Sequence, residues 1–500
     1  MVGKYVKDKK IILFLLTALL ILSKSVLWLI SIPALQTPDS DRHFSTIMWY
    51  AEKNDNTIER HKKPFSQNMY DVTTYHIPNE YMEFLNDIDF EQTRFNINSH
   101  QTLLNSTTVG KNEQKILNYN LDKNFHFSRP TVVSYPPLYY KINSYIYKLF
   151  FNTNILSRLY AIRLFSVLVG LLIAFVAYKS ARLLEFNSTQ SIIFTIIIAF
   201  QPMLSMLSIA INLDILLILA FSLFTYFSIR ILKSPLKFNK KNILSFIFSI
   251  TGLVLSVLMG IYTKPPAKIL ILYSAVLATF YIFRYLSPII HKIPHNIKQT
   301  ILRILAIFGF IFLLIPVLMR LTPLGDLLNK HIAFLGNQEI TIDDKILQFI
   351  KAETQITNTY LIISSYWGNF GWTDTPMHFS IYIIIMAIVI TLLSVFIYAL
   401  FKNTFKFKLI YVYLLILWFG FCLALIHFDF QYYLAKNNVY GLQGRYFMPI
   451  ILPSFLVLAK SINFIIKRYT FTTKLAFIGY LMILLNMIAL FYYIIPRYYL

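Results

Sequence analysis

The stretch IILFLLTALLILSKSVLWLISIPALQTPDSDRH, residues 11–43, joins a long apolar segment to a short polar cluster. The apolar part, 11–32, is long enough to cross a bilayer, which takes roughly 20 residues in a helix. It has a basic start but no Ala-x-Ala-like exit, so we interpret it as a retained membrane anchor rather than a cleaved signal peptide. The polar cluster PDSDRH at 38–43 would then lie at the membrane surface.

Composition indicates an integral membrane protein. Hydrophobic residues make up 57% of the chain and aromatic residues 17%, with a mean hydropathy of +0.58. Apolar runs of membrane-spanning length recur along the sequence, and we predict an all-α bundle of about eleven transmembrane helices. The expected spans lie near 11–32, 157–178, 189–206, 213–230, 243–261, 268–284, 303–320, 379–401, 408–427, 446–465 and 474–495.

Lysine and arginine predict the direction of the bundle, because they accumulate in short cytoplasmic loops. With the N-terminus inside, the inner loops are strongly basic, and only Asp8 and Glu185 oppose the trend. Much of the net charge of +23 lies on this inner rim, so it does not indicate a nucleic-acid partner. The single cysteine, Cys422, excludes an internal disulfide framework and any cysteine-based metal site.

The expected spans divide the chain into five parts, two of which are long segments on the outer face. We expect an inner N-terminus and first span at 1–32, an outer loop at 33–156, spans at 157–320, a second outer loop at 321–378 and further spans at 379–500. Both outer loops exceed ordinary connections, and we expect the first to form short helices along the membrane surface. The sequence has no Walker or dinucleotide glycine motif, so ATP-driven transport and redox chemistry lack their usual support.

Acidic residues follow the first span directly. A carboxylate of Asp39 or Asp41 at this boundary, with His43 beside it, is placed to take a proton from a hydroxyl group. The Asp-Ser-Asp triplet also resembles an oxygen ligand pair for a divalent ion, so Asp39 and Asp41 could hold Mg²⁺ or Mn²⁺. The alternative is a solvated turn, since Pro, Asp and Ser are turn formers.

Two cations lie at the same predicted face, Lys264 in TKPPAK at 263–268 and Arg445 in QGRYFMP at 443–449. Arginine pairs bidentately with phosphate and lysine supplies a compact charge, which suits a lipid phosphate whose tail stays in the bilayer. We group Gln443 with them as a phosphate-binding residue. Alternatively, each cation snorkels to the surface or pairs with a structural acid such as Asp214.

Aromatic residues complete the predicted outer face. Tyrosine and tryptophan can stack on sugar rings, but they also form ordinary belts at the membrane interface. The Pro and Gly residues among these aromatics favour a shaped pocket. Asp214, in NLD at 212–214, could complete that pocket or only cap the following helix, and the sequence favours the cap. The candidate pocket residues are Tyr135, Tyr139, Tyr140, Trp367, Trp372 and Asp214.

The order of these motifs resembles a large bacterial branch of the GT-C superfamily of integral membrane glycosyltransferases. The resemblance covers nearly the whole chain and depends on PD-x-x-x-H after the first span, YPPLYY at 135–140 and QGRYF-x-P entering a late span. It implies a GT-C-like bundle that moves a sugar from a polyprenyl-phosphate donor. The first-loop acid of similar enzymes is the catalytic base and matches Asp39, although Ser40 and Asp41 depart from the commoner Pro-Asp-Glu pattern.

The implied enzyme works at the outer face of a bacterial cell membrane. It would transfer the sugar with inversion to an envelope glycan, a lipid or a protein, without a nucleotide site. Two alternatives remain from the residues themselves. A polysaccharide or lipid-linked oligosaccharide transporter would place charges along a path through the membrane, and a non-catalytic scaffold would tolerate loss of Asp39 and Arg445.

Overall fold

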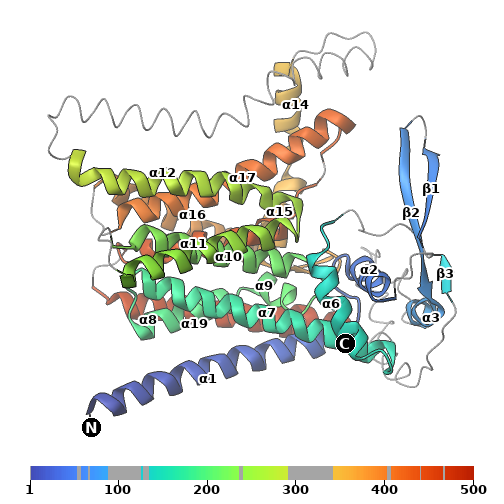
Figure 1. Ribbon diagram of the computed structural model, residues 1–500, viewed down its shortest axis with the longest axis horizontal. Coiled ribbons are helices and arrows are strands. Elements are labelled where there is room, and N and C mark those ends of the chain that lie inside the picture. Colours follow the sequence, from blue (N-terminus) through green and yellow to red (C-terminus); the bar gives the residue numbers. More distant parts are fainter. Residues whose placement is uncertain are drawn as a thin grey trace.

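The computed structural model describes residues 2–52, 58–65, 68–87, 125–127, 135–235, 240–290, 342–402, 407–439, 441–465 and 468–499. Within these ranges the fold is a bundle of long, roughly parallel helices, with smaller elements gathered at one end (Figure 1). The prediction of a helical membrane bundle, with short helices in the segments at 33–156 and 321–378, is confirmed for the described residues. The described residues also contain short strands, which the sequence did not predict.

The N-terminal half contains α1 (Val2–Ser31), α2 (Ser40–Glu52), β1 (Ile58–Phe65), β2 (Asn68–Pro78), α3 (Asn79–Asp87), β3 (Phe125–Phe127), α6 (Leu138–Leu149), α7 (Ile155–Leu183), α8 (Ser188–Ala199), α9 (Pro202–Leu207), α10 (Asp214–Lys233), α11 (Lys240–Ile261), the 3₁₀ helix η2 (Pro265–Lys268) and α12 (Ile269–Ile290). Strands β1, β2 and β3 form an antiparallel sheet in that order.

The C-terminal half contains α14 (Ile342–Glu353), α15 (Ile356–Trp367), β4 (Asn369–Phe370), β5 (Thr375–Pro376), α16 (Phe379–Phe401), α17 (Lys408–Lys436), the 3₁₀ helix η3 (Gly444–Ile450), α18 (Ile451–Ile462), α19 (Phe471–Ile488), the π-helix η4 (Ala489–Ile494) and α20 (Ile495–Tyr499). The two-residue strands β4 and β5 pair as a hairpin.

Nine helical segments of the described chain are long and apolar enough to cross a membrane. Nine of the eleven expected spans coincide with these segments, and the span expected at 303–320 lies outside the described residues. The N-terminal end of α1 and the C-terminal helix α20 lie at opposite ends of the bundle (Figure 1).

The span expected at 189–206 is a broken helix. The 12-residue helix α8 ends at Ala199, and α9 restarts at Pro202, whose ring nitrogen has no hydrogen to donate. The Gln201 side chain caps the new helix by accepting a hydrogen bond of 2.6 Å from the Leu204 backbone. The Lys24 ammonium group donates 2.9 Å to the Ala199 carbonyl oxygen at the end of α8, which compensates the broken end.

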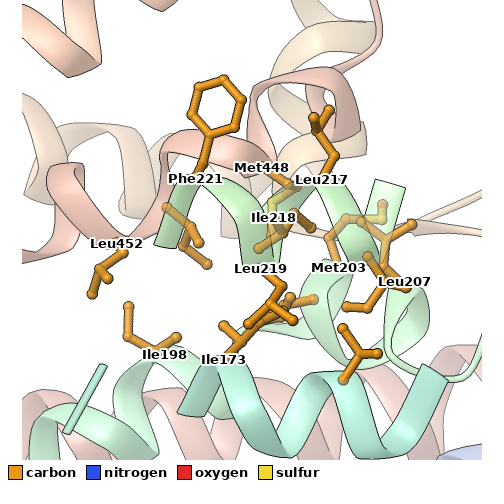
Figure 2. Packing of buried hydrophobic residues seen from close by; sticks show 14 of the residues in the cluster. Ile173, Ile198, Met203, Leu207, Leu217, Ile218, Leu219, Phe221, Met448 and Leu452 are labelled. Carbon is orange, nitrogen blue, oxygen red and sulfur yellow. The ribbon is translucent and has the colours of Figure 1, made fainter. Parts of the chain in front are cut away.

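Helix α10 is the centre of the bundle. Of the 18 residues in its apolar stretch, 83% are buried inside the protein. The corresponding share for α16, at the periphery, is 17%. Figure 2 shows apolar side chains of α10 lying among those of the surrounding helices, with labelled examples at Ile173, Ile198, Met203, Leu217, Ile218 and Leu452. Because the first residue of α10 is Asp214, this central packing fixes a carboxylate at one end of the bundle.

The small elements at this end are tied to the spans by buried polar contacts. Glu80 of α3 pairs with Arg158 of α7, and both side chains are 1% exposed. The Glu80 carboxylate also accepts a 3.0 Å hydrogen bond from the Ile155 backbone at the start of α7. The backbone N–H of Leu138, which begins α6, donates to the Tyr262 carbonyl oxygen after α11. These contacts hold α3 and α6 against the bundle.

Candidate functional site

A cavity of about 310 Å³ lies at the end of the bundle where α2, α10, η2 and η3 meet. It brings together segments that are far apart in the sequence, including the clusters PDSDRH and QGRYFMP. Seven of the predicted site residues line it: Asp39, His43, Tyr135, Asp214, Lys264, Gln443 and Arg445.

Asp39 lies between the first span and α2 in a left-handed backbone conformation, with φ of 60°. Few residues other than glycine, asparagine and aspartate adopt this conformation readily, and it is often found where function requires a constrained side chain. The conformation is held by neighbours: the His43 N–H donates to the Asp39 carbonyl oxygen at 3.0 Å, and the Asn212 side-chain amide donates to the Pro38 carbonyl oxygen at 3.3 Å. The Asp39 carboxylate remains 32% exposed within the cavity wall.

Arg445 is the partner of Asp39. Its Nη2 atom lies 2.7 Å from Asp39 Oδ2, and its side chain is only 4% exposed. The Nε and Nη1 atoms are buried and have no hydrogen-bond partner among the described residues. A buried charged donor without a partner is costly, so this guanidinium group has unused capacity to bind an anion.

The ion pair determines the protonation of Asp39. Burial alone would raise the pKa of this carboxyl group, but the positive charge of Arg445, with a smaller contribution from His43 and the hydrogen bond from Arg445, lowers the pKa to about 2. Asp39 is therefore ionised at neutral pH and available to accept a proton.

A second ion pair faces the same cavity. Lys264 Nζ lies 2.6 Å from Asp214 Oδ1, with side-chain exposures of 15% and 4%. The ammonium group also lies 5.1 Å from the centre of the Tyr446 ring and 6.0 Å from that of Tyr135. Burial disfavours the charge on Lys264, but Asp214 outweighs it and raises the lysine pKa. Lys264 therefore pairs with Asp214. This pairing was the structural alternative to phosphate binding that we considered for Lys264 from the sequence.

His43 lies beside both ion pairs. Its Nδ1 atom lies 2.9 Å from the Tyr140 hydroxyl oxygen, and the side chain is buried. Burial lowers the pKa of His43 to about 4, with Asp39 and Asp214 opposing the change and Lys264 and Arg445 adding to it. The imidazole is therefore neutral at physiological pH and acts there as a hydrogen-bonding group.

The remaining candidates do not line the cavity. Tyr139 and Tyr140 are fully buried in the packing of α6 against α2, where Tyr140 stacks on Tyr50. Asp41 lies in the first turn of α2, and its carbonyl oxygen accepts a hydrogen bond from the Tyr81 hydroxyl at 3.1 Å.

The two tryptophans also do not line this cavity. Trp367 ends α15 and lines an apolar cavity formed with α8, α16, α18 and α19. Trp372 lies in the turn between β4 and β5. Both therefore belong to the packing around α15 and the hairpin rather than to the cavity wall.

Several residues at the cavity were not predicted from the sequence. Arg42 and Tyr446 belong to the clusters quoted above and could have been included on that ground. The apolar wall formed by Leu213, Leu217, Phe421, Leu425, Phe428 and Leu442 carries no sequence signal, because such residues occur throughout the spans.

A buried arginine supports the acidic side of the cavity. Arg163 of α7 donates from Nη2 to the Ile32 carbonyl oxygen at 2.8 Å and from Nε to the Ile209 carbonyl oxygen at 2.9 Å. It therefore joins the end of α1 to the end of α9, the two segments that lead to Asp39 and to Asn212. Arg163 was not predicted, because an arginine in an apolar run has no motif around it.

The described residues contain no group of three His, Cys, Asp or Glu side chains able to hold a metal ion. The two acids considered as metal ligands, Asp39 and Asp41, have different surroundings. Asp39 pairs with Arg445, whereas Asp41 is not part of the cavity wall. The residues at the cavity therefore do not fit a site built on Asp39 and Asp41.

A family model described as "Predicted membrane protein (DUF2142)" matches residues 22–454. The chain belongs to this family. The range matched by the DUF2142 model includes every residue that lines the cavity. No curated protein was found to match the chain.

Two solved structures are similar to this DUF2142 protein at a low level. They are ArnT from Cupriavidus metallidurans in the apo state and ArnT from the same organism bound to undecaprenyl phosphate. Each is 13% identical, with TM-scores of 0.41 and 0.42, covering 93% and 92% of this chain and 61% and 60% of the ArnT chain. The chain spans about three fifths of the length of those structures, and a likeness of this degree assigns no activity.

Proposed function

We propose that this protein is a membrane glycosyltransferase of GT-C type. It transfers a sugar from a polyprenyl-phosphate donor to an acceptor hydroxyl group of an envelope glycan, a lipid or a protein. The reaction occurs at the extracytoplasmic face of a bacterial cell membrane, which is the face predicted from the basic inner loops. The segments at 33–156 and 321–378 are the two long parts of the chain that we expect on this face.

The observation that carries the proposal is the state of Arg445. This buried guanidinium group pairs with an acid that faces the cavity and retains two donor atoms without partners among the described residues. Lys264 lies on the wall of the same cavity. A phosphate group would accept hydrogen bonds from these free donors, in the charge-assisted pairing that arginine favours.

The cavity walls also suit a ligand with a polar and an apolar part. The charged residues form one side, and Leu217, Phe421 and Leu425 contribute to an apolar side. Phe428 continues this apolar side and is 52% exposed at the edge of the bundle. A lipid phosphate could therefore place its head group at Arg445 and its isoprenoid chain along α10 and α17.

The reaction we propose is a single displacement. The Asp39 carboxylate takes the proton of the acceptor hydroxyl group as that oxygen forms a bond to the anomeric carbon. The bond between the anomeric carbon and the phosphate oxygen breaks, and its electron pair stays on the phosphate. Arg445 and Lys264 stabilise the additional negative charge of the departing polyprenyl phosphate. The anomeric configuration is inverted.

Donor binding would also make Asp39 a stronger base. Arg445 holds the pKa of Asp39 at about 2 in the free protein, and a carboxylate of such low basicity accepts a proton poorly. A phosphate bound to the same guanidinium group brings a negative charge beside Asp39 and offsets that effect. No step of this scheme uses a metal ion or a nucleotide.

The direct test is a purified-protein assay with a panel of polyprenyl-phosphate sugars, following release of the free lipid phosphate. We expect release with at least one donor and an acceptor extract, and its loss in Arg445→Ala. Arg468→Ala, which changes an exposed arginine between α18 and α19, is the control and should keep wild-type release. Both variants must remain monodisperse in detergent.

The principal rival is a polysaccharide or lipid-linked oligosaccharide transporter. It would bind the same lipids but release no free lipid phosphate. Binding of polyprenyl-phosphate sugars without release from any donor of the panel would therefore contradict the transferase proposal and favour transport.

A further inference from the structure

Arg445 lies in the 3₁₀ helix η3, which follows α17 in the chain. Helix α17 ends at Lys436, with Asn437 in a left-handed conformation, and irregular chain leads to η3 at Gly444. Gly441 in this connection has φ of 82°, and nothing within 4 Å surrounds the position of a Cβ there. Leu442 beyond it is buried in the core, and the contacts of Gly444, the neighbour of Arg445, bear directly on the placement of that side chain.

Gly444 makes an unusually close contact with α15. A Cβ atom at this position would lie 2.0 Å from the Ile362 carbonyl oxygen and 2.3 Å from the Tyr366 backbone nitrogen. Both are backbone atoms of a helix and cannot turn away as a side chain could. The absence of a side chain at Gly444 is thus what allows η3 to approach α15.

One side chain fixes the register of this contact. The Gly444 N–H donates to the Ser365 hydroxyl oxygen at 2.6 Å, while the Ser365 hydroxyl donates to the Leu361 carbonyl oxygen within α15. The serine hydrogen is committed to Leu361, so the oxygen lone pairs are directed at Gly444. Ser365 is fully buried, and removal of its hydroxyl group would leave a buried N–H without an acceptor.

Helix α15 is itself held in place from its other side. The Gln201 side-chain amide donates to the Tyr366 carbonyl oxygen at 2.6 Å, and the same side chain caps α9. The chain of buried contacts therefore runs from α9 through α15 to Gly444 and, one residue later, to Arg445.

We propose that Ser365 is a positioning residue of the site, whose hydroxyl group, through Gly444, holds Arg445 with its free guanidinium donors directed to an anionic phosphate group. The inference rests on the proposed function, because that function gives Arg445 its phosphate. Ser365 itself does not touch the cavity.

The test measures binding of farnesyl phosphate, a short isoprenoid phosphate, to the full chain in detergent. Ser365→Ala should weaken binding by about fivefold to tenfold, the usual effect of losing one buried hydrogen bond. Ser364→Ala is the matched control: Ser364 is equally buried on the same helix, and among the described residues its hydroxyl group bonds only to the Leu361 carbonyl oxygen, at 3.3 Å. It should bind within about twofold of wild type.

A double-mutant cycle with Arg445 distinguishes positioning from a general structural effect. Adding Ser365→Ala to Arg445→Ala should cause no further loss of binding, because Ser365 acts through Arg445. An equal loss in both backgrounds, or wild-type affinity in Ser365→Ala, would overturn the inference. If Ser365→Ala does not fold, Ser365→Cys, which keeps a side chain of similar size with a weaker acceptor, takes its place in the cycle.

The outcomes separate this inference from the function on which it rests. Failure of the wild-type protein to bind farnesyl phosphate would refute both. Binding that depends on Arg445 but not on Ser365 would refute the positioning role alone.

Discussion

The two ion pairs at the cavity differ in what they leave available. In the pair of Asp39 with Arg445, the acid is 32% exposed on a left-handed backbone and the arginine keeps two donor atoms without described partners. In the pair of Asp214 with Lys264, the acid is 4% exposed at the start of the central helix, and the lysine also lies over two tyrosine rings. The first pair has groups free to react and bind, whereas the second is largely satisfied by the protein.

The comparison predicts different consequences for loss of each acid. Asp39→Asn should lower the transfer rate about 10²- to 10⁴-fold, the range for removal of a general base. Asparagine tolerates the left-handed backbone at this position, so the variant should fold. Asp214→Asn should cost about tenfold or less, because it weakens only the hold on Lys264. Rates of lipid phosphate release from the two purified variants provide the measurement.

Asp41→Asn is the control for this comparison, because Asp41 lies in the same segment but not at the cavity wall. Wild-type rates are expected. A large loss in Asp41→Asn with normal rates in Asp39→Asn would reverse the assignment of the base.

The pKa of His43 depends on the charges of both ion pairs. Its pKa falls from the usual 6.5 to about 4 through burial, while the two acids and the two cations act on it in opposite directions. The unfolded chain takes up this proton below pH 6.5, but the folded protein does so only near pH 4. Stability should therefore fall as the pH is lowered from 6.5 to 4, by about 3 kcal/mol in total.

Thermal unfolding in detergent between pH 7.5 and 4.5 measures this slope. His43→Gln should flatten it, and His378→Gln, at an exposed histidine that caps α16, should leave it unchanged. An unchanged slope in His43→Gln would show that His43 is not the group responsible.

Much of the fold could be predicted because a membrane helix is encoded locally. The spans followed from hydropathy alone, since each must bury its own backbone polar groups in lipid. The exception at 189–206 arose from Gln201 and Pro202, which end one helix and begin another inside an apolar run. Hydropathy does not register such a break, although a Gln-Pro pair in a span is a signal that could have indicated it.

The site could be predicted less completely. Topology placed PDSDRH and QGRYFMP on one face, but the pairing of Asp39 with Arg445 joins residues 406 positions apart and depends on tertiary packing. Tyr139 and Tyr140 could not be distinguished from pocket walls, because a tyrosine in a core and one at a ligand have the same local sequence. The cap expected at Asp214 was wrong, because the N-cap of α10 is Leu213 and has no side-chain hydrogen bond; Asp214 instead pairs with Lys264, the alternative offered for that lysine.

Substitutions of the two cations, Arg445 and Lys264, also test the difference between the two ion pairs. Arg445→Lys keeps the charge but loses the planar fork, and we expect a loss of about 10- to 100-fold in kcat/KM for the lipid-phosphate donor. Lys264→Arg keeps a cation beside Asp214 and should change kcat/KM by about threefold or less. Equal losses in the two variants would mean that the pairs are equivalent and that the free donors of Arg445 have no special role.

The smallest effect is expected at Arg42, which lines the cavity from α2 on its exposed side. It belongs to neither of the two ion pairs, and its charge makes the smallest contribution to lowering the pKa of Asp39. Arg42→Gln should weaken farnesyl phosphate binding about twofold to fivefold at low salt, and this difference should disappear near 0.5 M salt, where exposed charges are screened. Lys141→Gln, at an exposed lysine of α6 away from the cavity wall, is the control. The losses at Arg445 should persist at high salt because that guanidinium group is buried, so a salt titration of the three variants separates a buried phosphate ligand from a charge that only attracts one.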